Sequence, residues 1–460
     1  MPSVDLGAVF KAYDVRGVYP GQLDEQALSR IGAAFAEYCR APSVVVGRDM
    51  RESSEQLAAA FMEGVVGRGV DVVDVGLVST DALYYASGLY RMPGAMLTAS
   101  HNPSQYNGIK MCKAEAAPIG QDTGLAEIRR LAEEGLPSES KRGTVTKADI
   151  VDQFVEHLLS VVDTSAFRSL KVVIDAGNGM AGKMVPPVFE RLPVELVPLY
   201  FELDGTFPNH PADPIQITNL RDLIETVKAS DADLGMAFDG DADRVFFVDE
   251  QGSPASGSII TALVTAEVLE KEPGASIVYS LICSRVVPET IKERGGTAIR
   301  SRVGHSFIKR IMAESGAAFG GEHSGHYYFR ENFRADSGLM CALFVLSALS
   351  KQNRPMSEVL RPYRRYWNSG EINLTVEDQK VALDRLASAM PDGLHDWTDG
   401  LTVEFPDWWF NARGSNTEPL LRLNVEAENP EIGVALTEEL SQIIAASQRR
   451  STEAGNGGAA

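Results

Sequence analysis

The feature of the sequence that most constrains its fold is a set of short apolar segments that recurs three times along the chain. In each repeat two such segments precede a third, and the third runs directly into a strongly polar loop. Short β-branched segments that alternate with helix-length stretches are typical of parallel α/β units, so we expect three related α/β domains. The segments are Ser43–Val46, Val70–Val75 and Gly94–Leu97; Lys171–Ile174, Val194–Leu199 and Leu234–Phe238; and Ile277–Ser280, Thr297–Ser301 and Ala317–Phe319.

The polar loops after the third segments are TASHNP (98–103), DGDADR (239–244) and GEHSGH (321–326). Ligand sites in open α/β sheets form beyond the ends of the strands. We therefore expect the three domains to turn these loops toward one cleft.

The chain has 460 residues, which is too long for a single hydrophobic core. We expect the α/β domains at residues 1–150, 151–252 and 253–365, and a smaller α+β domain at 366–450. The Gly-rich end, 451–460, is expected to be disordered. The elements expected in the last domain are strands at Glu371–Thr375, Leu401–Phe405, Trp408–Asn411 and Leu420–Val425, and helices at Gln379–Ala389 and around 432–443.

The charge balance excludes several classes of partner. There are 43 Lys and Arg residues against 63 Asp and Glu residues, a net charge of -20. Nucleic acids and anionic membranes bind basic surfaces, so neither is an expected partner. The four cysteines are far apart and form no C-x-x-C pair, which favours reduced thiols in the cytoplasm. The N-terminus lacks a signal-peptide pattern, and the longest apolar stretch, Met340–Leu349, predicts a buried helix.

Asp239, Asp241 and Asp243 place three carboxylates at alternate positions after an apolar strand. Such a group is costly unless a cation neutralises it, and ligation by oxygen alone suits Mg²⁺ or Ca²⁺. An EF-hand is the obvious alternative, because Glu250 falls at the twelfth position of such a loop. Its sixth position, which needs Gly, is Arg244, and the flanks are expected strands, so we reject the EF-hand.

The Ser100–His101 pair in the first polar loop combines a nucleophile-type hydroxyl with an imidazole at the tip of a strand. Pro103 ends the strand because it cannot donate to a ladder. A serine that only turns the chain is the simpler interpretation of such a pair taken alone.

Gly177–Gly182 matches G-x-G-x-x-G after an expected strand, and Glu202 stands where a ribose-binding carboxylate could lie. This pattern would suit a dinucleotide-dependent dehydrogenase. We favour a tight strand-to-helix turn, because a dinucleotide site would leave the Ser100 loop and the aspartate triplet unexplained.

Two further polar segments complete the set. GEHSGH offers groups that can bind sugar hydroxyls, and RGSNTEP (413–419) joins a guanidinium to small hydrogen-bond donors, as phosphate binding requires. A nucleophilic serine, a divalent cation, a hydroxyl-binding loop and a phosphate-binding loop together indicate phosphoryl transfer.

With these motifs the chain resembles the α-D-phosphohexomutase family, and the resemblance extends to about residue 447. The resemblance is carried by the three polar loops, RGSNTEP and the segments FKAYDVRG (10–17), GRD (47–49) and FPNH (207–210). It implies three related α/β domains and a C-terminal domain like the TATA-box-binding-protein fold around a central cleft. It also implies interconversion of mannose 6-phosphate and mannose 1-phosphate, and of the glucose phosphates, through a phosphoserine enzyme and a hexose 1,6-bisphosphate.

The resemblance assigns roles to individual residues. Ser100 is the phosphorylated serine and, with Asp239, Asp241 and Asp243, holds one Mg²⁺. Arg16 and His101 lie near the phosphoserine, and Lys110 and His326 assist proton transfer. The substrate-binding residues implied are Arg244, His305, Glu322, Ser324, Arg413, Ser415, Asn416 and Thr417.

The sequence departs from the family at two positions, Ile282 and Asn424, where some relatives have Lys and Arg. At Ile282 one substrate or phosphate contact is either missing or supplied by Arg285, and near Asn424 the candidate substitute is Arg422. Phosphoglucosamine mutase is the alternative activity, and such enzymes more often have Gln at the position of His323. A phosphosugar is the expected small-molecule partner, and both a monomer and a dimer remain open.

Overall fold

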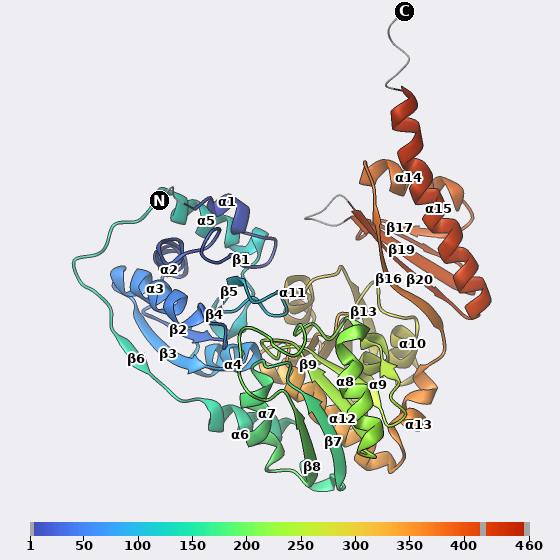
Figure 1. Cartoon of the computed structure of the whole chain (residues 1–460), viewed down its shortest axis with the longest axis horizontal. Coiled ribbons are helices and arrows are strands. Elements are labelled where there is room, and N and C mark those ends of the chain that lie inside the picture. Colours follow the sequence, from blue (N-terminus) through green and yellow to red (C-terminus); the bar gives the residue numbers. More distant parts are fainter. Residues whose placement is uncertain (1–3, 415–419, 455–460) are drawn as a thin grey trace, which may run out of the picture.

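Four β-sheets organise the chain in the computed structural model, which describes residues 4–414 and 420–454 (Figure 1). The three expected repeats share one sheet motif. A central strand pairs in parallel with two neighbours, and the third strand pairs antiparallel with the strand that follows the polar loop. In sheet order these motifs are β3 (Asp71–Leu77), β2 (Ser43–Arg48), β4 (Gly94–Leu97) and β5 (Tyr106–Cys112); β8 (Val194–Leu199), β7 (Leu170–Asp175), β9 (Leu234–Phe238) and β10 (Val245–Asp249); and β13 (Thr297–Ser301), β12 (Ser276–Ser280), β14 (Phe319–Gly321) and β15 (Tyr327–Phe329).

The third strand of the third repeat lies two residues later than expected, because the sheet accepts Gly320 and Gly321. From the sequence alone, glycines that follow an apolar segment predict a loop. Here a Cβ on Gly321 would come within 2.4 Å of the Thr261 side chain, so the glycine permits close packing of a helix against the strand.

Further strands and helices complete each α/β domain. The first domain adds β1 (Val15–Val18), β6 (Val145–Lys147), α1 (Leu6–Val9), α2 (Glu25–Cys39), α3 (Ser54–Gly67), α4 (Thr80–Tyr90) and α5 (Leu125–Glu134). The second adds α6 (Val151–Val161), α7 (Ala181–Phe189), α8 (Arg221–Ala229) and β11 (Pro254–Ala255). The third adds α9 (Gly257–Lys271), α10 (Val286–Glu293), α11 (His305–Ser315), α12 (Gly338–Gln352) and α13 (Met356–Leu360).

The fourth sheet is entirely antiparallel and carries the two helices of the last domain. Its order is β16 (Trp367–Thr375), β20 (Leu420–Ala427), β19 (Trp408–Gly414), β18 (Leu401–Glu404) and β17 (Leu394–Asp396), with α14 (Gln379–Ala389) and α15 (Pro430–Ala454). α15 continues to Ala454, and residues 455–460 of the expected disordered tail lie outside the described residues.

One hydrophobic cluster extends through the first three domains, the first domain has a second cluster of its own, and the fourth domain has a separate core. α12 lies inside the shared cluster, with every residue from Gly338 to Ser350 buried, as expected for a helix that is apolar on all sides. The fourth domain, orange to red in Figure 1, stands to one side of the others. Polar contacts join it to the third domain: Arg285 donates to backbone carbonyls of Phe405, Pro406 and Trp408, Arg300 pairs with Glu404, and the Val303 amide donates to Asp399.

Within the described part of the chain, no helix is long and apolar enough to cross a membrane.

Candidate active site

The three polar loops converge as expected, and backbone contacts join them directly. The carbonyl of Ser100 packs against Gly240, where an added Cβ would lie 2.4 Å from it. Arg244 and His326, at the ends of the second and third loops, form a β-bridge. The loops border a large cleft lined by all four domains, with Tyr13 and His101 from the first, Asp213 and Arg244 from the second, Gly304 and Ser324 from the third, and Glu371, Arg413 and Arg422 from the fourth.

Ser100 has a left-handed backbone conformation, with φ of +50°. That conformation costs a non-glycine residue about 1–2 kcal/mol, so the surrounding contacts must hold it. The Ser100 amide donates to Thr98 Oγ1 at 2.9 Å, and the Ser100 hydroxyl donates to Asp239 Oδ2 at 2.7 Å. His101 Nδ1 lies 3.2 Å from the same hydroxyl. The serine is therefore fixed between the imidazole and the aspartate triplet.

The aspartate triplet has the donor set of a hard-cation site. Oxygens of Asp239, Asp241 and Asp243 all lie within 4.8 Å of one another, and all three residues are buried. Oδ1 of Asp241 and Oδ1 of Asp243 have no hydrogen-bond partner. Buried carboxylate oxygens without partners are costly, and oxygen donors are what Mg²⁺ prefers. The residues present thus fit a divalent cation.

The charges around the triplet are balanced by two cations. Arg244 donates from Nε to Asp239 Oδ2 at 2.9 Å, and Lys110 Nζ lies 2.7 Å from Asp241 Oδ2 and also bonds Asp243. Burial raises the pKa of Asp243 to about 7, and the Asp241 charge adds to the effect. Burial also favours the neutral form of Asp241, but the Lys110 ammonium and hydrogen bonds from Lys110 and Thr80 keep its pKa below the usual value.

Lys110 and His326 differ in protonation. Burial alone would lower the Lys110 pKa, but the Asp241 and Asp243 carboxylates raise it above its usual value, so Lys110 stays charged. Burial lowers the pKa of His326 to about 4 despite the nearby carboxylates of Asp243 and Asp336, so its imidazole is neutral at pH 7. Of the two expected proton-transfer groups, His326 is the one able to accept a proton.

His101 and Arg16 lie beside Ser100, as the sequence predicts. Arg244 Nη2 lies 2.5 Å from His101 Nδ1, which makes Nδ1 the acceptor. Burial and the charges of Arg244 and Arg16 hold the pKa of His101 well below its usual value. Arg16 donates to the Asn102 side chain and, at 3.3 Å, to the Ala99 carbonyl, so its charge lies against the serine loop.

The third loop presents Ser324 to the cleft and fixes Glu322 behind it. Glu322 accepts from the Gly304 amide at 3.0 Å and from the Tyr328 hydroxyl at 2.6 Å, while Ser324 Oγ lies 3.0 Å from His326 Nδ1. His305 is the first residue of α11, and its ring packs edge-on against Tyr13 at 5.1 Å between centroids. His305 is not among the cleft-lining residues, although its neighbour Gly304 is.

The fourth domain contributes a pair of arginines. Arg413 and Arg422 are direct neighbours across β19 and β20, and both approach the Glu371 carboxylate, at 2.7 and 3.4 Å. All three residues line the cleft. The expected phosphate-binding residues Ser415, Asn416 and Thr417 lie outside the described residues.

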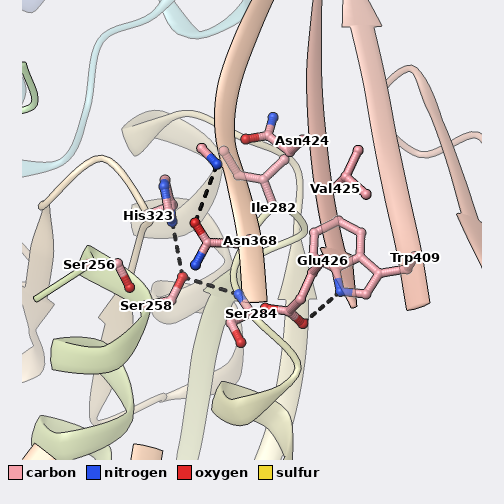
Figure 2. Close-up of a pocket in the computed structure, with 11 residues that line it drawn as sticks. Ser256, Ser258, Ile282, Ser284, His323, Asn368, Trp409, Asn424, Val425 and Glu426 are labelled. Atoms are coloured by element: carbon pink, nitrogen blue, oxygen red, sulfur yellow. Dashed lines mark hydrogen bonds between the residues drawn. The ribbon is translucent and has the colours of Figure 1, made fainter. Parts of the chain in front are cut away.

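The two departures from the family pattern lie together. Ile282 and Asn424 line one small recess between the third and fourth domains, beside His323 (Figure 2). Asn424 Nδ2 is buried there without a hydrogen-bond partner. The Arg285 guanidinium donates to backbone carbonyls of Phe405, Pro406 and Trp408, and Arg285 is not among the residues that line the cleft. Arg422 does face the cleft.

Comparison with known proteins matches the chain to four domain models in order. These are phosphoglucomutase/phosphomannomutase alpha/beta/alpha domain I (residues 7–138), domain II (152–252) and domain III (256–366), and the phosphoglucomutase/phosphomannomutase C-terminal domain (371–442). The chain belongs to the phosphoglucomutase/phosphomannomutase family. It is a phosphohexomutase, and hence an isomerase.

Relatives cover almost the whole chain. A phosphomannomutase of Escherichia coli is 38% identical over 95% of this chain and 98% of its own length. One of Methanocaldococcus jannaschii is 37% identical over 95% and 97%. The crystal structure of a phosphoglucomutase/phosphomannomutase family protein from Burkholderia thailandensis matches with a TM-score of 0.89 and 34% identity, over 97% of this chain and 98% of that one.

The glycine-rich turn at 177–182 does not form a dinucleotide site. It joins β7 to α7, and a Cβ on Gly179 would lie 2.7 Å from the Gly240 carbonyl oxygen. The loop 239–244, which carries the aspartate triplet, therefore fills the space that a pyrophosphate would need.

Sequence reasoning missed the residues that support the loops from behind. Thr80, at the start of α4, donates to Asp241 Oδ2 at 2.5 Å. Asp336 lies 3.8 Å from His326 Nε2 and is paired at 2.7 Å with the buried Lys309. In the sequence, Thr80 and Asp336 are marked only by their position next to the start of a helix. That position does not predict a contact with a distant loop.

Proposed function

We propose that the protein interconverts mannose 6-phosphate and mannose 1-phosphate and also accepts the corresponding glucose phosphates. The observation that carries the proposal is the Ser100 hydroxyl, which donates to Asp239 Oδ2 at 2.7 Å and lies 3.2 Å from His101 Nδ1, a residue that lines the cleft formed by all four domains. The curated relatives from E. coli and M. jannaschii are phosphomannomutases, which favours mannose phosphates as substrates.

In the first half-reaction, phosphorylated Ser100 donates its phosphoryl group to the free 1- or 6-hydroxyl of the sugar phosphate. The bond between phosphorus and Ser100 Oγ breaks as a bond to the sugar oxygen forms. The proton of the sugar hydroxyl passes to neutral His326, and the released Ser100 oxygen takes a proton from charged Lys110. Before the transfer, Lys110 and Arg244 balance negative charge around the phosphoryl group.

Asp239, Asp241 and Asp243, with a phosphoryl oxygen on Ser100, would hold Mg²⁺. When bound, the cation neutralises charge on the transferring phosphoryl group. The chain's own residues then keep Ser100 aligned, since Asp239 also contacts its hydroxyl directly.

In the second half-reaction, the hexose 1,6-bisphosphate turns around in the cleft and returns its other phosphoryl group to Ser100 Oγ. As Ser100 Oγ attacks, its proton returns to Lys110, and His326 gives its proton to the sugar oxygen that is released. Arg413, with Ser415, Asn416 and Thr417, holds the phosphate that is not transferred, and Glu322 and Ser324 bind the sugar hydroxyls. Because one phosphate-binding loop serves either end of the sugar, one site performs both half-reactions, and added bisphosphate activates dephosphorylated enzyme.

All four cysteines are free thiols, which agrees with the reducing cytoplasm that we propose as the location of the enzyme.

The test is mutase turnover on mannose 1-phosphate, glucose 1-phosphate and glucosamine 1-phosphate, each with Mg²⁺ and catalytic hexose 1,6-bisphosphate. We expect comparable rates on mannose and glucose phosphates and none with Ser100→Ala. Preference for glucosamine 1-phosphate would instead assign the protein as a phosphoglucosamine mutase. No turnover on any of the three sugars would refute the proposal.

A further inference from the structure

The side chain of Arg51 is completely buried beneath the Ser100 loop. Arg51 lies between β2 and α3, and its guanidinium donates to four backbone carbonyls of one short segment. Nη2 donates to the carbonyls of Ser100 at 2.7 Å and Asn102 at 2.6 Å. Nη1 donates to the carbonyls of Pro103 and Tyr106, both at 2.9 Å.

Four carbonyls that converge on one point need a buried donor, because unsatisfied backbone oxygens are costly away from water. A guanidinium is suited to this role, since it carries five N–H donors in a rigid plane, whereas an ammonium carries three and no plane. The Ser100 carbonyl is one of the four, and its residue has the unfavourable left-handed conformation. Arg51 therefore holds the carbonyl of Ser100 itself, and so acts on the backbone that orients the Ser100 hydroxyl.

Arg51 is itself held on two sides. Asp49 Oδ2 lies 3.2 Å from Arg51 Nε with neither side chain exposed, and Asp49 Oδ1 accepts from the Arg51 amide at 3.1 Å. From the second domain, the Phe207 ring centroid lies 5.1 Å from Arg51 Cζ. Gly205 lies so close that a Cβ on it would be 2.6 Å from Arg51 Cα. The second domain, which carries the aspartate triplet, thus covers Arg51.

We propose that Arg51 is a positioning residue that fixes the Ser100 loop, so that the Ser100 hydroxyl meets Asp239 and the phosphoryl-transfer geometry is set before substrate binds. The inference rests on the proposed function for its effect on catalysis, but not for its effect on the loop. Among the described residues, the Arg51 side chain contacts the Ser100 loop, Asp49 and Phe207 and makes no hydrogen bond to Glu322, Ser324 or Arg413, so we place its contribution in the transfer step and not in substrate binding.

The experiment compares Arg51→Met and Arg51→Lys with wild type in the full-length enzyme. Arg30→Met is the matched control, because Arg30 in the same domain also donates to backbone carbonyls, those of Ala132 and Glu133, away from the cleft. Three quantities are measured: kcat and KM on mannose 1-phosphate, the thermal midpoint, and amide hydrogen exchange of residues 98–107 by mass spectrometry.

For Arg51→Met we expect kcat to fall on the order of 100-fold, the usual penalty for a misplaced reacting group, with KM changed less than about threefold. Arg51→Lys retains the charge but not the planar donors, so its kcat should lie between those of wild type and Arg51→Met. Exchange of 98–107 should accelerate in both variants and stay unchanged in Arg30→Met.

Unchanged kcat and loop exchange in a folded Arg51→Met would overturn the proposal. So would a loss of kcat accompanied by equal acceleration of exchange across the first domain, because that pattern marks a merely structural residue. If Arg51→Met does not fold, the same criteria apply to Arg51→Lys. If wild type lacks mutase turnover, the proposed function fails, and the exchange of residues 98–107 still decides whether Arg51 fixes the loop.

Discussion

The hydroxyl of Ser100 lies 2.7 Å from a carboxylate oxygen of Asp239, although 139 residues separate them in the chain. The contact joins the polar loops of two domains that have the same sheet motif. Each loop connects the third strand of its motif to the antiparallel strand that follows. The pairing of the Ser100 hydroxyl with a carboxylate of the aspartate triplet is therefore a consequence of how the repeated domains face each other.

Replacing Asp241 with Asn removes a charge from the triplet while keeping its shape. We expect turnover and apparent Mg²⁺ affinity to fall together, by at least about 10- to 100-fold, the cost usual even for groups that only support a metal ligand. Activity measured across a Mg²⁺ titration tests this. Asp152→Asn, at a side chain that is 91% exposed, is the control. Full activity at wild-type Mg²⁺ concentrations would contradict the metal assignment.

Lys110→Met leaves the buried carboxylates of Asp241 and Asp243 without their shared cation. Removing one partner of a buried ion pair costs about 3–5 kcal/mol, so the thermal midpoint without divalent cation should drop. Mg²⁺ should then raise the midpoint of this variant more than that of wild type, because it supplies the missing charge. Lys147→Met, at an exposed lysine, should respond like wild type. Equal Mg²⁺ responses in Lys110→Met and wild type would argue against a cation among these aspartates.

Asp81 makes stability depend on pH. It is buried at the start of α4 and accepts from Ser337 Oγ at 2.6 Å. Burial raises its pKa from 3.8 to about 7, so the folded protein holds a proton there that the unfolded chain releases. Stability from this group is therefore full below about pH 4 and is lost as the pH rises to about 7. Within that window, each pH unit lowers the free energy of unfolding by about 1.4 kcal/mol.

The expected result is that Asp81→Asn, which cannot ionise, becomes more stable relative to wild type as the pH rises from 5 to 8. Thermal midpoints of both proteins across this range provide the comparison. A difference that does not change with pH would show that Asp81 is charged in the folded protein at every pH tested.

Arg413 and Arg422, the neighbouring arginines of the fourth domain, should contribute to substrate binding. Arg413→Met should raise KM about 10- to 100-fold, as expected when a charge-assisted hydrogen bond to phosphate is lost. Arg422→Met should raise KM less, because the expected phosphate-binding segment, 413–419, contains Arg413 and not Arg422. Steady-state kinetics with Arg354→Met, an exposed arginine, as control measure both effects. An unchanged KM in Arg413→Met would remove Arg413 from the phosphate site.

The sequence predicts the repeated domains because the alternation of short apolar segments and helices is a local property. It also predicts that Ser100, Asp239 and His326 converge, because ligand sites lie at strand ends. It places β14 two residues too early and misses β17, since Gly320 and Gly321 act through packing with Thr261 and β17 has only three residues.

The supporting residues could not be predicted in the same way. Arg51, Thr80 and Lys309 act on loops that are distant in sequence or belong to another domain. Nothing in their immediate neighbours distinguishes an arginine that binds four carbonyls from one that faces water. Their roles depend on how elements are arranged in space, which the local pattern does not record.

The separate core of the fourth domain has a thermodynamic consequence. Arg285, Arg300 and Val303 join that domain to the third through carbonyl and carboxylate contacts, which water can replace when the two move apart. Exposure of apolar surface is what raises heat capacity. Movement of the fourth domain away from the third should therefore change the heat capacity little and become easier as salt screens the Arg300–Glu404 pair.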